Sequence, residues 1–358
     1  MTQLSGARVA PQDLTAFCLE AMRLCGVSEE DARLSAEVLV TTDTMGTFTH
    51  GTRQLRGILR NVRAGRIDPT ASAEVDTEGP AWAIVNGHDA MPPAVAYRAM
   101  KLAIEKARAC GIGYVGVRHA SHFGAAGFYA HLAMREDMIG VSMCNVDPCM
   151  SVPGSRGKVL GTNPIAYAAP AGDEPPVSLD IATSAVAVTK IFAAKALGQS
   201  IPDGWLVDDD GRPTTDPSEY PEKGAALPMA GHKGYGLAVL VEVLAGVLTG
   251  ASIMSQIKSW VADTPEPTDG GYAFIAIDVG AMMPVSEFKG RMDGMIREIK
   301  SAPKAQGADR IWLPGEMEWE RRGKALVEGI PLPAEVVLSL RELAEDSGLD
   351  PERFNLKL

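Results

Sequence analysis

The stretch "AYRAMKLAIEKARACGIGYVGV", Ala96–Val117, decides which fold the sequence predicts. It contains the spacing G-x-G-x-x-G at Gly111–Gly116, which is typical of the Rossmann turn that binds a dinucleotide. Glu136 and Asp137 follow near the distance at which that motif expects an acid for the ribose. A Rossmann turn also requires a strand before the glycines and a helix after them.

The elements around these glycines stand in the reverse order. Apolar residues recur at helical spacing before the glycines, at Met100, Ala103, Ile104 and Ala107. Gly111 is placed like a glycine that ends a helix, and a strand follows from Tyr114. Such a loop faces the C-terminal end of a helix, whose dipole is unfavourable for a pyrophosphate. The stretch therefore predicts a glycine-capped turn from helix to strand, and the cofactor is expected elsewhere.

Composition narrows the class of protein. The chain has 358 residues, of which 46% are apolar and 22% are charged, with a net charge of −11. This predicts an ordinary globular protein with a sizeable core. Because no basic run occurs, neither nucleic acid nor a membrane surface is expected as a partner.

The cysteines, the N-terminal residues and the apolar runs of the sequence indicate which cellular compartment to expect for the protein. The five cysteines include no C-x-x-C pair, so we expect reduced thiols in a cytoplasmic protein. The N-terminal "MTQLSGARVAPQDL" lacks the pattern of a secretory signal. The longest apolar run, Leu237–Leu248, is too short to span a bilayer and carries Glu242, so we expect a buried core helix there.

Two regions of the chain differ in the secondary structure that their sequence predicts. Residues 1–75 predict a small helical subdomain, which the helices within 316–358 are candidates to join. Residues 76–315 alternate short β-rich runs with helices, which predicts an α/β core for binding cofactor and substrate. No internal repeat or low-complexity tract occurs.

The first segment with candidate catalytic residues is "VRHASHFGAAGFYA", Val117–Ala130. His122 follows a predicted strand and precedes the small residues of Gly124–Gly127, which let a flat ligand approach the backbone. A histidine there suits a general acid/base, and a structural histidine capping the turn is the alternative. His119 and His122 could together serve a metal, but no neighbouring carboxylate or cysteine completes a set, so no metal site is expected.

A second histidine lies in "TFTHGTRQL", Thr47–Leu55. Thr49 and Arg53 flank His50 in a predicted loop between helices, and a cation beside a proton donor suits a substrate with a carboxylate. A solvent-exposed turn between helices is the alternative interpretation of this segment.

Two further segments resemble anion-binding turns. "PVSLDIATSAVAVTK" predicts a strand ending at Asp180, a turn in which Thr183 or Ser184 caps a helix, and free N–H groups that suit a phosphate. "GHKGYG" places Lys233 among glycines at the start of the next apolar helix. "DDDGRPTTD", by contrast, does not match a calcium loop and predicts a β-turn.

Taken in order along the chain, "HFGAAG", "GTNPIA", "LDIATS", "PTTDP", "HKGYGL" and "LPGE" resemble the malate/L-lactate dehydrogenase family. This resemblance covers nearly the whole chain. It implies a non-Rossmann α/β fold with a mixed sheet and a helical N-terminal subdomain, assembled as a homodimer. It also implies an NAD(P)-dependent oxidoreductase, with NAD expected and NADP the alternative.

The resemblance assigns roles to residues. It implies that His122 and His50 act at the reacting centre and that Thr49 and Arg53 hold the substrate. The implied cofactor-binding residues are Asn145, Asp180, Ile181, Ala182, Thr183, Ser184, Lys233, Gly315 and Glu316. The sequence departs from the family at Thr49, where serine is usual, and at Gln54, where the family usually has an arginine. Either Arg53 substitutes for that arginine from a shifted direction, or the substrate is held differently.

The expected reaction is hydride transfer between a nicotinamide and C2 of a small 2-hydroxy or 2-oxo acid, similar to malate or lactate. Reduction of a cyclic imino acid or action on a ureidoglycolate-type substrate is the alternative on the same scaffold. A metal-dependent hydrolase or lyase built on His50, His119 and His122 is a third interpretation. A cofactor-binding protein without turnover, suggested by Gln54, is a fourth.

Overall fold

The turn at Gly111 joins a helix to a strand. In the computed structural model, which describes residues 8–356, helix α4 (Pro92–Cys110) ends where Gly111 takes φ 84° and donates its N–H to the carbonyl of Ala107. Strand β4 (Ile112–Ala120) begins at the next residue. A positive φ favours glycine, which explains why the glycine stands there. The Rossmann-like spacing is therefore a helix end, as the flanking sequence predicts.

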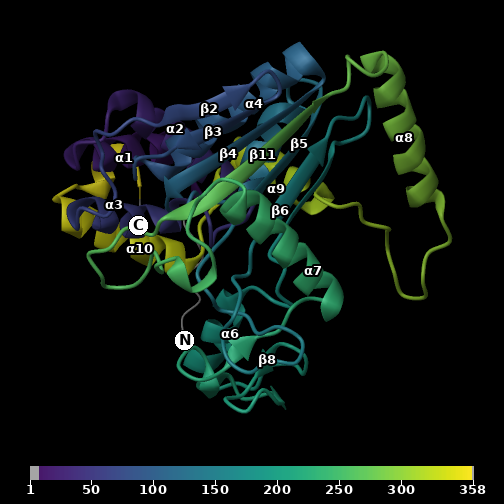
Figure 1. Ribbon diagram of the computed structural model, residues 1–358. Coiled ribbons are helices and arrows are strands. Elements are labelled where there is room, and N and C mark those ends of the chain that lie inside the picture. The colour runs from purple at the N-terminus through teal and green to yellow at the C-terminus, as the bar shows by residue number, and fades with distance from the viewer. Residues whose placement is uncertain (1–7, 357–358) are drawn as a thin grey trace.

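A mixed sheet of seven strands forms the centre of the molecule (Figure 1). Its spatial order is β2-β3-β4-β11-β5-β6-β7, and only β3 and β4 run parallel. The remaining bounds are β2 Glu74–Gly79, β3 Trp82–Asn86, β5 Met138–Cys144, β6 Ile165–Ala169, β7 Val177–Ile181 and β11 Gly270–Asp278. A Rossmann domain requires a parallel sheet, so the mixed order confirms the predicted non-Rossmann α/β class.

The two faces of the sheet are covered by different helices. On the central strand β11, Tyr272 and Phe274 point into the core formed with α4 and α5 (Ala126–Met134), whereas Ala273 points to the opposite face. This alternation follows from the two-residue period of a strand. On that opposite face the sheet packs against α7 (His232–Val241) and the π-helical turn Glu242–Val247.

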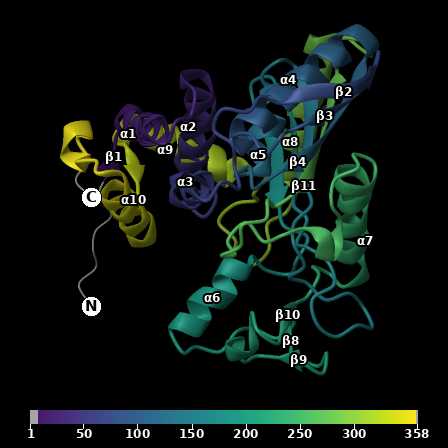
Figure 2. The same ribbon diagram turned by 60° about the vertical axis from the view of Figure 1, so that its left-hand side comes forward.

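The first and last helices share a second core. It joins α1 (Pro11–Leu24), α2 (Glu29–Thr44) and α3 (Leu55–Arg63) to α9 (Glu316–Glu328) and α10 (Ala334–Ser347), which lie side by side in Figure 2. Strand β1 (Arg8–Val9) also pairs with β12 (Ile330–Pro331). The predicted boundaries at 75 and 315 stay predictions. The predicted absence of a signal falls partly on residues 1–7, outside the described residues.

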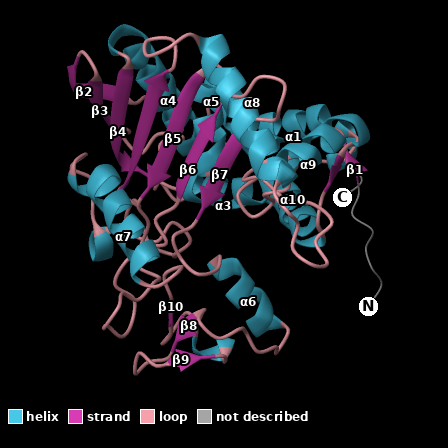
Figure 3. Cartoon of the chain, turned by 90° about the vertical axis from the view of Figure 1, so that its right-hand side faces the viewer, coloured by secondary structure: helices cyan, strands magenta, loops and turns pink. Residues whose placement is uncertain are grey.

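A small lobe below the sheet was not foreseen from the sequence (Figure 3). It contains α6 (Val188–Ala196) and the short strands β8 (Leu206–Val207), β9 (Pro213–Thr214) and β10 (Ala225–Ala226) around their own apolar cluster. The predicted β-turn of "DDDGRPTTD" joins β8 to β9, where Asp208 Oδ1 accepts the N–H groups of Asp210 and Arg212.

The predicted cap of α6 is wrong. Ala187, not Thr183 or Ser184, precedes this helix, and no side chain caps it. The hydroxyl of Thr183 donates to the carbonyl of Thr162, and that of Ser184 donates to the carbonyl of Val186. Both hydroxyls are therefore used before the helix begins.

The predicted buried helix at Leu237–Leu248 is only half buried. Val241, Glu242 and Ala245 lie inside, but the opposite side exposes apolar side chains, namely Leu237, Val239, Leu240, Val243, Val247 and Leu248. Helix α8 (Val285–Ser301) lies beside the β7 edge of the sheet. Among the described residues, no helix is both long and apolar enough to cross a membrane.

Candidate active site

A cleft of about 1400 Å³ lies between the sheet, the helical core and the small lobe. It is lined by the α2–α3 connection, the β4–α5 loop, the end of β7, α10 and the segment Ser259–Val261. Of the predicted site residues, the cleft brings together Thr49, His50, Arg53, His122, Asp180, Ile181, Ala182 and Gly315. Ligand sites commonly occupy 300–1,000 Å³, so this volume has room for two ligands.

His122 is held by the turn between β4 and α5. Its Nδ1 accepts the N–H of Gly124 at 3.3 Å, so the neutral ring carries its proton on Nε2. Gly124 takes φ 90°, and a Cβ there would lie 3.4 Å from the carbonyl oxygen of His50. The positive φ, rather than a lack of space, is therefore what favours glycine in this turn.

His50 lies against His122 at the α2–α3 connection. The two imidazole rings stack with centroids 5.5 Å apart and an interplanar angle of 28°. The Thr49 hydroxyl lies 2.8 Å from His50 Nδ1, and the Gln54 amide donates to the carbonyl of Thr49. Gln54 thus holds the turn that carries His50, which accounts for a residue that the family resemblance left unexplained.

Both histidines are neutral near pH 7. Burial, together with the smaller effect of the positive charge of Arg53, lowers the pKa of His50 to about 4. Burial, followed by the effect of His50, lowers the pKa of His122 to about 3. A bound anion beside the rings would oppose both effects, because a negative charge favours the imidazolium.

Asp180 brings a carboxylate to the cleft from the end of β7. Its Oδ2 accepts the N–H of Gly127 at 2.8 Å in the first turn of α5. The surrounding protein raises the pKa of its carboxyl to about 6, since desolvation outweighs this hydrogen bond, and the charge of Glu318 acts in the same direction. The carboxylate is still accessible from the cleft, so its other lone pairs can accept hydrogen bonds from ligand hydroxyls.

Five predicted cofactor residues do not line this cleft. Thr183 and Ser184 are buried in the turn after β7, and Lys233 is exposed at the start of α7. The side chain of Asn145 binds Glu242, the Ser252 carbonyl and the Gly271 N–H, while Glu316 binds Lys300, Arg310 and the Leu313 N–H. Roles for these five residues in binding the cofactor stay predictions.

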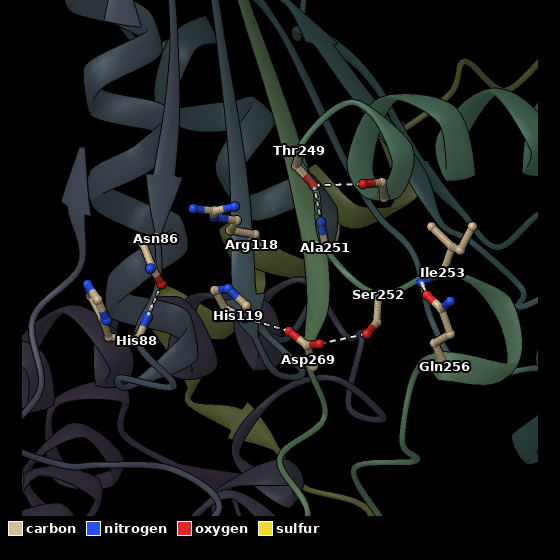
Figure 4. Close-up of polar contacts among 12 residues, drawn as sticks. Asn86, His88, Arg118, His119, Thr249, Ala251, Ser252, Ile253, Gln256 and Asp269 are labelled. Atoms are coloured by element: carbon tan, nitrogen blue, oxygen red, sulfur yellow. Dashed lines mark hydrogen bonds and ion pairs between the residues drawn. The ribbon is translucent and has the colours of Figure 1, made fainter. Parts of the chain in front are cut away.

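His119 belongs to a different cluster from His122. Its Nδ1 lies 2.7 Å from Asp269 Oδ1, and Asp269 Oδ2 accepts the Ser252 hydroxyl at 2.6 Å (Figure 4). This cluster joins the end of β4 to Asp269, directly before β11, and to Ser252, which follows the π-helical turn. Within residues 8–356, no group of three or more His, Cys, Asp or Glu side chains is arranged to hold a metal ion.

Sequence reasoning missed two residues at the histidine pair. Trp260 stacks on His122 with ring centroids 4.5 Å apart. Asp43, at the end of α2, accepts the N–H and the hydroxyl of Thr52 with its Oδ2, two residues after His50. No local motif marks either residue, because both reach the site through tertiary packing.

The fold and the cleft together define an enzyme in which paired histidines lie at one end of a ligand-binding cleft and a carboxylate lies in the same cleft. The sequence matches the malate/L-lactate dehydrogenase family over residues 9–341. A malate/(S)-sulfolactate dehydrogenase from Methanothermus fervidus is 37% identical, over 96% of this chain and 98% of the relative. The ureidoglycolate dehydrogenase of Escherichia coli K12 is 33% identical, over 87% and 88%.

Solved structures agree with this match. The malate dehydrogenase of Pyrococcus horikoshii has a TM-score of 0.88 at 35% identity, covering 98% of each chain. The sulfolactate dehydrogenase of Methanocaldococcus jannaschii also reaches 0.88, at 36% identity over 98% of this chain and all of the other. The chain belongs to the malate/L-lactate dehydrogenase family. It is an NAD(P)-dependent dehydrogenase that acts on a CH–OH group.

The cleft residues fit a dinucleotide cofactor. Small residues at the start of α5 leave its backbone accessible beside Asp180, and the N-terminal end of this helix faces the cleft. The Asp180 carboxylate accepts the Gly127 N–H at this end, and its remaining lone pairs suit ribose hydroxyls. The ribose of a dinucleotide thus finds a complementary group in the cleft.

Proposed function

We propose that the protein interconverts a small 2-hydroxy acid and its 2-oxo acid, similar to malate or sulfolactate. The observation that carries this proposal is the stacked pair His50 and His122 beside Arg53. A proton carrier and a cation side by side suit a carbonyl that is adjacent to a carboxylate.

In this mechanism, His122 manages the proton at the substrate oxygen. The cofactor, when bound, gives or takes the hydride at C2 of the substrate. During reduction, the His122 imidazolium gives its Nε2 proton to the oxygen as the carbonyl becomes a hydroxyl, which leaves a neutral ring with its remaining proton on Nδ1. During oxidation, Nε2 of this neutral ring takes the proton back, and the Nδ1–H tautomer requires the ring to release the N–H of Gly124. The negative charge of the bound substrate raises the pKa of His122 and so makes the imidazolium available.

His50 and Arg53 orient the substrate. Nδ1 of His50 is engaged by Thr49, so its Nε2 is the nitrogen available to the substrate oxygen or carboxylate. Arg53 precedes α3 by two residues and faces the cleft near His50, where its guanidinium is suited to bind the carboxylate. Arg53 thereby replaces the arginine that the family places at Gln54.

We also propose NAD as the preferred cofactor. Asp180 and Glu318 line the same part of the cleft, where Glu318 affects the pKa of Asp180. Carboxylates accept hydrogen bonds from ribose hydroxyls but repel the 2′-phosphate of NADP. A lower KM for NADH than for NADPH is the expected result.

A homodimer in the cytoplasm is the proposed assembly and location. The exposed apolar side of α7 and the π-helical turn, from Leu237 to Leu248, would be covered by a second copy of the chain. All five cysteines are free thiols, as expected in a reducing compartment.

One experiment tests the reaction. NADH and NADPH absorbance is followed with the purified protein and a panel of 2-oxo acids bearing a second carboxylate, a sulfonate or a methyl group, and cyclic imino acids. Turnover with an acidic 2-oxo acid supports the proposal. Turnover confined to cyclic imino acids, or cofactor binding without any turnover, would contradict it.

A further inference from the structure

Trp260 belongs to a segment that is held in place by hydrogen bonds from residues outside the cleft. This segment, Ile257–Thr268, is here called the strap. The buried guanidinium of Arg66 donates to four of its carbonyls, those of Ser259, Trp260, Ala262 and Glu266, at 2.8 to 3.3 Å. The Asn61 amide adds a hydrogen bond of 2.9 Å to the carbonyl of Trp260.

The indole is fixed between the histidine and α3. Its ring stacks on His122 with centroids 4.5 Å apart and an interplanar angle of 27°. It also contacts Gly57, where a Cβ would lie only 2.7 Å from the Cζ3 atom of the indole. An alanine at this position would therefore push the indole, because the clashing atom belongs to a ring and not to a flexible chain end.

We propose that Trp260 is a positioning residue for proton transfer, whose indole face fixes the ring plane of His122 and stabilises its protonated form. The proposal rests on the proposed role of His122 as the proton carrier. An aromatic face attracts a cation most strongly where water is excluded. The strap thus supplies a stabilising interaction that appears only when the histidine holds its extra proton.

The other groups near His122 act in the opposite direction. His50 on the α2–α3 connection disfavours a positive charge on His122. The N–H of Gly124 faces Nδ1 and also favours the neutral ring. The strap contributes no ionisable side chain at Ser259–Val261. Apart from the bound substrate, the groups that favour the imidazolium are a backbone hydrogen bond of His122 itself and the indole face.

The test is the pH dependence of kcat for reduction. Trp260→Leu removes the aromatic face but keeps an apolar side chain, so its high-pH limb should move down by roughly one pH unit. Trp260→Phe keeps an aromatic face and should restore most of the position of the limb. KM for the cofactor should stay within about twofold in both variants, because Asp180 and the start of α5, to which the cofactor is assigned, are not altered.

A second variant perturbs the stack without removing the tryptophan. Gly57→Ala lies inside α3, where alanine favours the helix, so the variant should fold while it displaces the indole. In this variant, the high-pH limb of the kcat profile should move to lower pH by a few tenths of a pH unit or more. Gly294→Ala in α8, where a Cβ meets nothing within 4 Å, is the matched control and should leave the profile unchanged.

The outcomes separate the two proposals. The role of Trp260 is overturned if the high-pH limb of the kcat profile is unchanged in both Trp260→Leu and Gly57→Ala. It is also overturned if this limb moves as far in Trp260→Phe as in Trp260→Leu. Absence of nicotinamide-dependent turnover in the unaltered chain instead overturns the proposed function, and the inference with it.

Discussion

Asp43 predicts an unusual dependence of stability on pH. The side chain is 1% exposed, and burial raises the pKa of its carboxyl from 3.8 to about 7, although Oδ2 accepts two hydrogen bonds from Thr52. Its Oδ1 is buried without a partner among the described residues. Because the folded chain prefers the protonated carboxyl, this group makes folding less favourable as pH rises from about 4 to about 7.

The magnitude follows from the size of the pKa change. A rise from 3.8 to about 7 corresponds to about 4 kcal/mol between the two protonation states. Asp43→Asn cannot ionise and keeps an oxygen that can accept from Thr52. Relative to the unaltered chain, the free energy of unfolding of this variant should therefore increase by about 4 kcal/mol between pH 4 and pH 8.

Urea unfolding of both chains at intervals from pH 4 to pH 8 measures this difference. The histidines of low pKa also make folding more favourable as pH rises, because the folded chain prefers their neutral forms. Both chains carry these histidines, so their contribution cancels when the two free energies of unfolding are subtracted. Thr52→Val is the control, because it removes one hydrogen bond to Oδ2 and leaves the ionisable group in place. A constant difference between the Asp43→Asn variant and the unaltered chain across this range would refute the reasoning.

Four further predictions concern the cleft and the exposed apolar face. His122→Asn should lower kcat on the order of 10²- to 10⁴-fold with little change in KM for the cofactor, measured by steady-state kinetics. Arg53→Gln should raise KM for the acid substrate roughly 10- to 100-fold, as expected for a lost charged hydrogen bond, and an unchanged KM would contradict its role. Leu240→Glu with Val247→Glu should convert a dimer to a monomer in analytical ultracentrifugation, since these side chains are 45% and 59% exposed. Cofactor affinity should weaken below about pH 6 as Asp180 is protonated, and Asp180→Asn should remove this dependence in calorimetric titrations.

Local patterns in the sequence predict the elements that local chemistry determines. The helix end at Gly111 and the β-turn in "DDDGRPTTD" both depend on a few neighbouring residues. The family motifs also predict the two histidines that the cleft brings together.

What could not be predicted depends on distant parts of the chain. Trp260 reaches His122 because Arg66, nearly 200 residues earlier, binds the strap carbonyls. The capping role given to Thr183 fails because Thr162 already binds its hydroxyl. The exposed side of the Leu237–Leu248 segment could not be distinguished from its buried side, because both sides are apolar. Each of these features depends on tertiary contacts that local periodicity does not encode.

The pairing of β1 with β12 has a consequence for synthesis of the chain. The helical core that it closes combines residues 9–67, Met91 and Ala94 with residues 325–356, so its last apolar surface is synthesised long after its first helices. Until then, the buried sides of α1, α2 and α3 lack α10 as a packing partner. Contacts of such long sequence separation form slowly. Because α10 also lines the cleft, the ligand site is complete only after this later segment has been made, and chains that stop before α10 would expose apolar helices to chaperones.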